Sequence, residues 1–144
     1  MPVDDALLQV HAAVTAALAG LVWVVQLVVY PAFLVTGPTS AWPAYHRRHT
    51  AAMALVVAVP WAAQGLVVAA LLVRQPGPLV LLAAALAAVT VAVTVGVSVP
   101  LHTRLGVAYD EQVARRLIRT NWARTAAWTA GAVVAAVLAA RGAS

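Results

Sequence analysis

Cysteine and lysine are both absent from this chain of 144 residues. Without cysteine there can be no disulfides, thiolate metal sites or iron–sulfur clusters. Without lysine there can be no Schiff-base chemistry, and all nine basic residues are arginine. Only 9% of the residues are charged, whereas a soluble domain usually carries about a quarter. The sequence therefore cannot build a surface that faces water on all sides.

Acidic residues are also scarce, with four in the whole chain and none inside a long apolar run. A four-span exporter that exchanges its substrate for protons needs a carboxylate embedded in the membrane, so the sequence argues against that class. The net charge of +5 comes from arginines that flank the apolar runs. We interpret this charge as a signal of membrane topology and predict no nucleic-acid binding.

Hydrophobic residues make up 64% of the chain and gather in long runs. About 20 apolar residues cross the hydrocarbon core of a bilayer. In lipid the backbone groups of a span must bond to one another, which makes the span a helix. The sequence therefore predicts an all-α fold, a single integral membrane four-helix bundle over residues 1–144. The four predicted spans cover residues 6–30, 50–73, 79–99 and 121–140.

Arginine is distributed unevenly among the connections between these spans. The first and third connections, with the start of the fourth span, contain Arg47, Arg48, Arg104, Arg115, Arg116, Arg119 and Arg124. The opposite side has only Arg74 and Arg141, offset by Asp4 and Asp5. Excess arginine in short loops marks the cytoplasmic side. We therefore expect a multi-pass protein of the cell (plasma) membrane with both termini outside.

The third connection contains an amphipathic pattern. In residues 110–120 the apolar Val113, Leu117 and Ile118 are spaced i, i+4 and i+5, and arginines occupy the other faces. Asp110 and Glu111 at its start suit the positive end of a helix. The pattern predicts a short helix that lies on the cytoplasmic surface, with its arginines toward lipid phosphates.

Polar residues recur with helical spacing near the predicted cytoplasmic ends of the spans. Those spaced four apart are Thr90, Thr94, Ser98 and His102, then Gln26 and Tyr30, and then Asn121 and Thr125. Such residues either hold helices together by hydrogen bonds or form a functional site. Because these span ends share one depth, we expect His102 to face Asn121, with Gln26 and His46 or His49 nearby. His102, Asn121 and His46 are the catalytic candidates.

Large aromatic rings are concentrated in the same half of the predicted bundle. Tyr30 and Trp122 lie near the interface, whereas Trp23 and Trp128 lie roughly 10 Å deeper. These rings predict either an interfacial aromatic belt with core packing, or a pocket for a flat apolar molecule. For the pocket, the candidate substrate-binding residues are Gln26, Tyr30, Trp23, Trp122, Arg124 and Trp128.

Three histidines offer a second kind of site. His46 and His49 are three residues apart, which places them on one face of a helix. With His102 they supply three imidazoles, a ligand set used for Zn and Cu. Alternatively, histidines beside Arg47 and Arg48 bind phospholipid headgroups.

Three short segments carry a resemblance to a known family. VYPAF at residues 29–33 ends the first span, VPLH at 99–102 ends the third, and NWART at 121–125 begins the fourth. In these segments and in its layout, the chain resembles the anthrone oxygenase-like family of small four-span membrane proteins. That family often has asparagine after VPL, whereas this chain has His102. The resemblance implies an oxygenase that acts on polycyclic phenolic anthrones without flavin or haem.

The candidate residues suit this chemistry. His102 or His46 would remove a proton, because histidine titrates near neutral pH. Asn121 and Gln26 would donate hydrogen bonds to the oxyanion that forms, and the positive charge of Arg124 would favour it. The tryptophan side chains would stack on the aromatic rings.

Two functions from different classes follow. The first is a cofactor-independent oxygenase that oxidises or binds an apolar aromatic molecule at the cytoplasmic membrane face. The second is a non-catalytic accessory subunit, or a module that binds a small molecule or a Zn or Cu ion through the three histidines. The expected partners are membrane lipid and an apolar small molecule. Small residues at Ala12, Ala16 and Gly20 would also permit a homo-oligomer.

Overall fold

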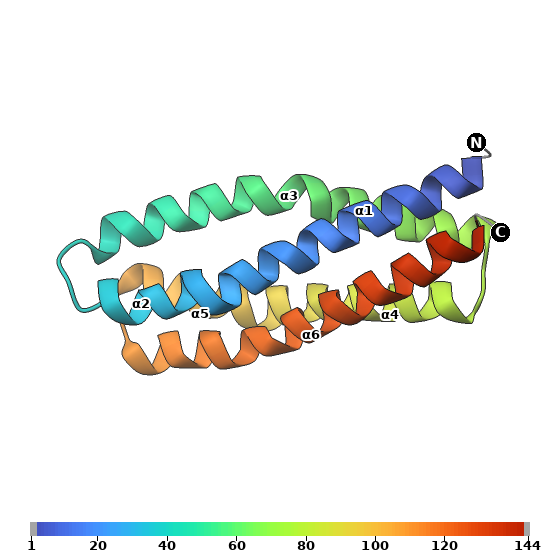
Figure 1. Ribbon diagram of the computed structural model, residues 1–144. Helices are drawn as coiled ribbons and strands as arrows, with labels where there is room; N and C mark the ends of the chain where they lie inside the picture. The colour runs from blue at the N-terminus through green and yellow to red at the C-terminus, as the bar shows by residue number, and fades with distance from the viewer. Residues whose placement is uncertain (1–2, 143–144) are drawn as a thin grey trace.

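The computed structural model describes residues 3–142, and these form an all-α bundle of four long rods (Figure 1). The predicted four-helix fold is confirmed, because each rod is long and apolar enough to cross a membrane. The elements in chain order are α1 (Val3–Val24), η1 (Val25–Val29), α2 (Tyr30–Thr36), α3 (Trp42–Arg74), α4 (Pro78–Val93), η2 (Thr94–Ser98), α5 (Val99–Val107) and α6 (Glu111–Gly142). The first rod joins α1, η1 and α2, and the third joins α4, η2 and α5.

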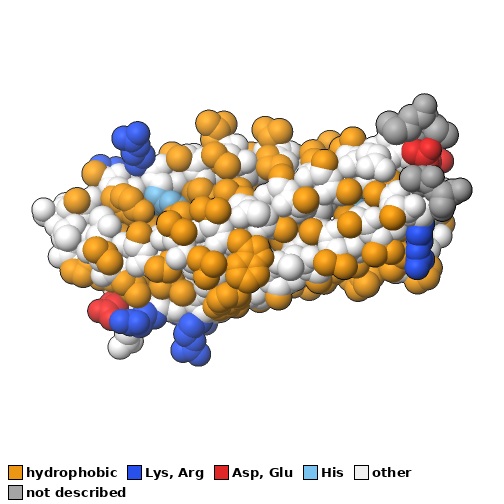
Figure 2. Space-filling model, in the orientation of Figure 1, with side chains coloured by type: hydrophobic (Ala, Val, Ile, Leu, Met, Phe, Trp, Pro, Cys, Tyr) orange, Lys and Arg blue, Asp and Glu red, His pale blue; other side chains and the backbone are white. Residues whose placement is uncertain are grey.

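The two ends of the bundle differ in charge. We call the end that holds the turns at 37–41 and 108–110 the arginine-rich end, because most arginines lie in the adjoining turns of helix. The other end, the terminal end, holds the beginning of α1, the end of α6 and the turn at 75–77 (Figure 1). On the face drawn in Figure 2, apolar side chains fill the length between charged groups at the two ends.

Pro31 and Pro100 do not end the helical rods in which they occur, although the predicted spans stop just before them, at residues 30 and 99. A proline lacks an N–H group and clashes with the carbonyl of the residue four positions earlier. Each proline follows a π-helical segment, Val25–Val29 or Thr94–Ser98, whose wider turn relieves that conflict. The first connection therefore shrinks from the predicted 31–49 to residues 37–41.

The segment 110–120 is helical after Asp110, as the sequence predicts, but it is not a separate surface helix. It forms the first turns of α6, which runs unbroken to Gly142. Asp110 caps this helix, because its carboxylate accepts hydrogen bonds from the backbone N–H groups of Gln112 and Val113. Val113 and Leu117 are buried in the bundle, so the apolar face packs against protein and not against lipid.

The four rods do not pack evenly. α1 lies closely along α6 and α3, and α6 lies closely along α4, whereas the contact between α3 and α5 is much smaller. The core at the arginine-rich end is aromatic and contains Tyr30, Phe33 and Trp42. Trp42 ties α3 to α5 there, since its indole N–H donates to the carbonyl of Leu105 at 3.0 Å. Beyond this tie, α3 and α5 leave a space between them.

Candidate functional site

A cavity of about 640 Å³ lies between α3 and the η2–α5 rod, in the arginine-rich half of the bundle. We call it the α3–α5 cavity. One part of its wall is apolar and includes Met53, Val57 and Trp61. The polar part includes Tyr30, His46, Arg47, His49, Ser98, His102 and Arg124. The sequence placed most of these polar residues at one depth, and the fold brings them to one cavity.

The cavity is open toward the lipid-facing side of the bundle. Val99 belongs to its wall and is 53% exposed, which puts it at the rim. Leu55 and Val59, on the same helix as the other wall, are also exposed apolar residues. Histidine atoms reach the surface close to the arginines of this end on the face drawn in Figure 2. Apolar side chains are thus exposed on both of the helices that bound the cavity.

A chain of hydrogen bonds crosses the polar wall. The Tyr30 hydroxyl lies 3.1 Å from His102 Nε2, and His102 Nδ1 lies 3.2 Å from His46 Nε2. The Tyr30 hydroxyl can donate to His102 while His102 donates to His46, or both bonds can run in the reverse direction. We call this set the Tyr30–His102–His46 relay. A proton can pass along such a chain only if its hydrogen bonds can run in both directions, and the relay meets this condition.

Phe33 holds the imidazoles in place. It is completely buried, and its ring centre lies 5.0 Å from that of His49 and 6.1 Å from those of His46 and His102. His49 in turn stacks on His102 at 5.8 Å. From the sequence, Phe33 was noted only as part of the VYPAF segment at residues 29–33. Its signal was available, because it is the single phenylalanine of the chain.

The three histidines of the alternative Zn or Cu interpretation, His46, His49 and His102, all lie in the polar wall of the cavity. Among residues 3–142, no group of three or more His, Cys, Asp or Glu side chains is arranged to hold a metal ion. The physical reason is that His102 uses both ring nitrogens in the relay, and His49 presents its ring face to His102. Stacked rings do not point their nitrogens at one centre.

Arg124 is the buried charged group of the cavity wall, which also includes the exposed Arg47. Its side chain is 9% exposed, and its position is roughly 20 Å along α6 from Glu111. One guanidinium nitrogen donates to the Ser98 hydroxyl at 3.4 Å, and the group lies 5.0 Å from the ring centre of Trp128. Trp128 is thus a buried neighbour of the cavity wall and supports Arg124 by a cation–π contact.

Asn121 does not face His102, and that prediction is wrong. Asn121 is fully buried and donates to Gln26 Oε1 at 2.8 Å, while Gln26 Nε2 donates to the carbonyl of Ile118 at 3.2 Å. Both side chains lie in the contact between the first rod and α6, outside the cavity wall. Gln26 sits within the π-helical segment, whose wider turn removes the regular four-residue alignment of Gln26 with Tyr30.

Trp23 and Trp122 also lie outside the cavity, contrary to the predicted substrate-binding set. They form an edge-to-face pair at 5.6 Å on the outer surface, where they are 39% and 47% exposed. Trp23 donates to the hydroxyl of Thr129 at 3.0 Å. This pair fixes the surface contact of α1 with α6. Trp61, which the prediction did not include, lines the cavity in its place.

Comparison with protein family models, with curated proteins and with solved structures finds no match for this chain. The resemblance to anthrone oxygenase-like proteins, expected from the three short motifs, stays a prediction. The fold brings those motifs together, since Tyr30, His102 and Arg124 come one from each and all line the same cavity.

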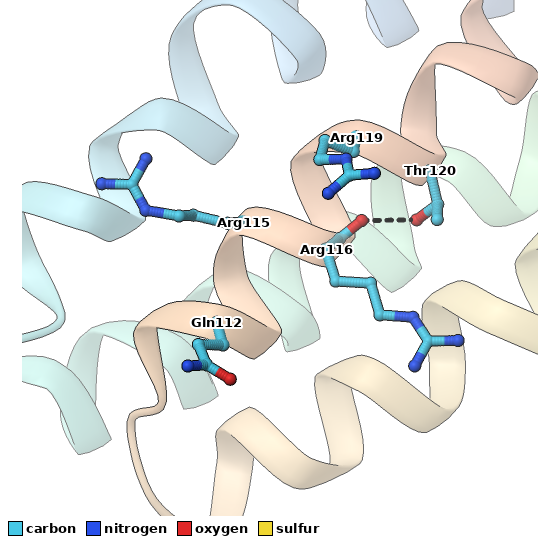
Figure 3. A pocket seen from close by; sticks show the side chains of 5 residues that line it. All are labelled: Gln112, Arg115, Arg116, Arg119 and Thr120. Atoms are coloured by element: carbon cyan, nitrogen blue, oxygen red, sulfur yellow. Dashed lines mark hydrogen bonds between the residues drawn. The ribbon is translucent and has the colours of Figure 1, made fainter.

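A second cavity, of about 630 Å³, lies on the outside of α6 near the arginine-rich end. Figure 3 shows the residues that line it, which are Gln112, Arg115, Arg116, Arg119 and Thr120. The Thr120 hydroxyl donates to the carbonyl of Arg116 at 2.9 Å (Figure 3). Arg115 pairs with Glu111 at 2.7 Å, and both are exposed. This surface is strongly cationic and shallow.

Polar residues also occur deep in the terminal half. Gln64 donates to Thr15 and accepts from Trp128, each at 3.2 Å, so it joins three rods. His11, in the same half of the bundle, is 1% exposed. Its Nδ1 has no hydrogen-bond partner within residues 3–142.

Proposed function

We propose that the α3–α5 cavity binds a flat, largely apolar molecule from the lipid and that the protein oxidises it. The observation that carries the proposal is the combination of an apolar wall, open sideways, with the Tyr30–His102–His46 relay. Small-molecule sites typically enclose about 300 to 1,000 Å³ and are mostly apolar, with a few placed polar groups. The cavity volume of about 640 Å³ is in this range.

The relay supports acid–base chemistry that needs no cofactor. The Tyr30 oxygen takes a proton from the substrate as its own proton passes to His102 Nε2. The Nδ1 proton of His102 then passes to His46 Nε2, which leaves the positive charge on His46 near the arginine-rich end. A hydroxylated anthrone suits this step, because loss of its methylene proton gives an electron-rich anion. One anthrone and one O2 then yield one anthraquinone and one water.

The test uses purified protein in lipid nanodiscs, a hydroxylated anthrone and air-saturated buffer. Formation of anthraquinone is followed by absorbance and compared with empty nanodiscs. General acid–base catalysis typically contributes about 100-fold or more, so His102→Ala should lower the catalysed rate by about that factor. Trp23→Ala is the matched control, because it removes a ring from the lipid-facing surface and should leave the rate unchanged.

A binding function without catalysis is the second candidate. It is favoured by the engagement of both His102 nitrogens, which leaves no free lone pair for a substrate proton. Wild-type protein that binds the anthrone but does not exceed the spontaneous rate would establish this alternative. Failure to bind any flat apolar molecule would reject both functions.

We also propose that the protein lies in the cell membrane with its arginine-rich end in the cytoplasm and both termini outside. The proposal is supported by the concentration of arginine at one end. The cationic surface of Figure 3 would then face anionic lipid headgroups. Lipid that copurifies with the protein should be enriched in anionic species, and Arg116→Gln with Arg119→Gln should reduce that enrichment.

A further inference from the structure

Arg124 presents an unbalanced positive charge inside the bundle. Arginine in a membrane span is rare, and when present it faces the protein interior and pairs with another group. Here the side chain is 9% exposed and forms part of the cavity wall. Its Nε has no hydrogen-bond partner in the part of the chain that the structure describes. A buried cation with an unused donor indicates that a counter-ion is missing from its surroundings.

None of the four acidic side chains supplies that counter-ion. Asp4 pairs with Arg74 at 2.7 Å at the terminal end, and Asp5 lies at the same end beside Gly142. At the other end Asp110 caps α6, and Glu111 pairs with an arginine one turn further along. These residues account for every Asp and Glu in the sequence.

The neutral neighbours of Arg124 compensate its charge only in part. The bond to the Ser98 hydroxyl is long, at 3.4 Å, against roughly 2.9 Å for a good N–H···O bond. The Tyr30 hydroxyl lines the same cavity, and the Trp128 ring centre lies 5.0 Å from the guanidinium carbon. A hydroxyl and a ring face attract a cation more weakly than an anion does. The buried guanidinium therefore lacks a full counter-charge, which an anionic ligand in the cavity would supply.

We propose that Arg124 is the anion-binding group of the α3–α5 cavity, and that the ligand is held as a lipid-soluble aromatic anion such as a phenolate or enolate. This inference rests on the proposed function in using the same cavity. The aromatic class follows from the walls, where Trp61 and His49 present flat rings. Tyr30 takes the substrate proton in the proposed relay, and Arg124 lines the same cavity. The positive guanidinium would therefore stabilise the negative charge that the substrate acquires.

The experiment compares two dyes of one shape and different charge. 2,4-Dinitro-1-naphthol is ionised at neutral pH, whereas its methyl ether is neutral. Binding to protein in lipid nanodiscs is measured by quenching of tryptophan fluorescence, since Trp61 lines the cavity, and empty nanodiscs correct for partition. A hydrogen bond to a charged group changes affinity by roughly 10- to 100-fold. We expect wild-type protein to prefer the anion by about this factor.

Three variants show whether Arg124 causes the preference. Arg124→Gln should bind the anion only as tightly as the ether, with ether affinity unchanged. Arg124→Lys should keep part of the preference, because it keeps the charge without the planar donor pair. Arg116→Gln, an exposed arginine of the same helix, is the matched control and should behave as wild type. Arg124→Gln should also keep or raise the thermal midpoint, since it removes a buried charge.

The outcomes separate this inference from the proposed function. Equal binding of ether and anion by wild-type protein would overturn the role of Arg124 and leave the cavity as a site for neutral molecules. An anion preference that survives Arg124→Gln would also overturn that role and assign the preference to another cation, such as Arg47 in the same wall. Tighter binding of dodecanoate than of the dye would overturn the aromatic class. If neither dye binds, the cavity function and this inference both fail.

Discussion

Replacing Asn121 should cost stability and spare binding, although the sequence alone made it a catalytic candidate. Asn121 is fully buried and bonds to Gln26 at 2.8 Å, away from the cavity wall. In Asn121→Ala the Gln26 Oε1 atom loses its donor in an apolar setting. Leaving one buried polar atom unpaired costs about 1 to 3 kcal/mol. The variant should therefore unfold more easily, while the bound dye or substrate keeps wild-type affinity.

A double-mutant cycle isolates the bond itself. Hydrogen bonds between membrane helices show coupling energies of roughly 0.6 to 1.7 kcal/mol, so Gln26→Leu with Asn121→Leu should destabilise by less than the sum of the single variants. Reversible unfolding in mixed micelles, followed by tryptophan fluorescence, gives the four free energies. A coupling energy near zero would refute the structural role. The structural role would also be refuted if Asn121→Ala had wild-type stability but no longer bound the dye or the substrate.

Three further predictions follow from the ends of the bundle. In intact cells, a thiol reagent added outside should label a single cysteine placed at position 4 strongly and one placed at position 47 not at all. The reverse labelling pattern would overturn the proposed orientation. A Cβ at Gly37 would overlap the Tyr109 ring, so Gly37→Ala should destabilise by about 1 to 3 kcal/mol in thermal unfolding, and Tyr109→Ala should relieve much of that cost. Burial raises the pKa of Tyr109 above its ordinary value of 10.0, so its contribution to stability should be complete below pH 10 and decline at higher pH. Tyr109→Phe should lack that alkaline decline, and an unchanged decline would assign it to another group.

The sequence determined the class of this protein and the depth of its polar groups. A chain that is 64% hydrophobic and 9% charged cannot remain in water, and backbone groups in lipid require helices. The lengths of the apolar runs then predicted four spans. Counting residues from the ends of those runs placed His102, Asn121, Gln26 and His46 or His49 at one depth. The histidines do line one cavity, whereas Asn121 and Gln26 lie outside its wall.

Local geometry limited that prediction at the two prolines. The rules for soluble helices end a helix near Pro31, but the π-helical turns before Pro31 and Pro100 let both helices continue. An extra residue in a turn also shifts every later side chain around the helix axis. Spacing alone therefore could not tell that Tyr30 lines the cavity while Gln26 lies behind it.

The tertiary structure decided which face of each helix points inward. In water the apolar face of a helix identifies its buried side, but in a bilayer the lipid and the protein interior are equally apolar. Valine, alanine and leucine surround these helices on all sides, so the pattern does not mark a buried face. Only the packing of whole helices settled that Trp23 and Trp122 face outward, that Trp61 faces the cavity, and that Asn121 meets Gln26. Rotation about the helix axis is a property of the four rods together, and no single run of residues contains it.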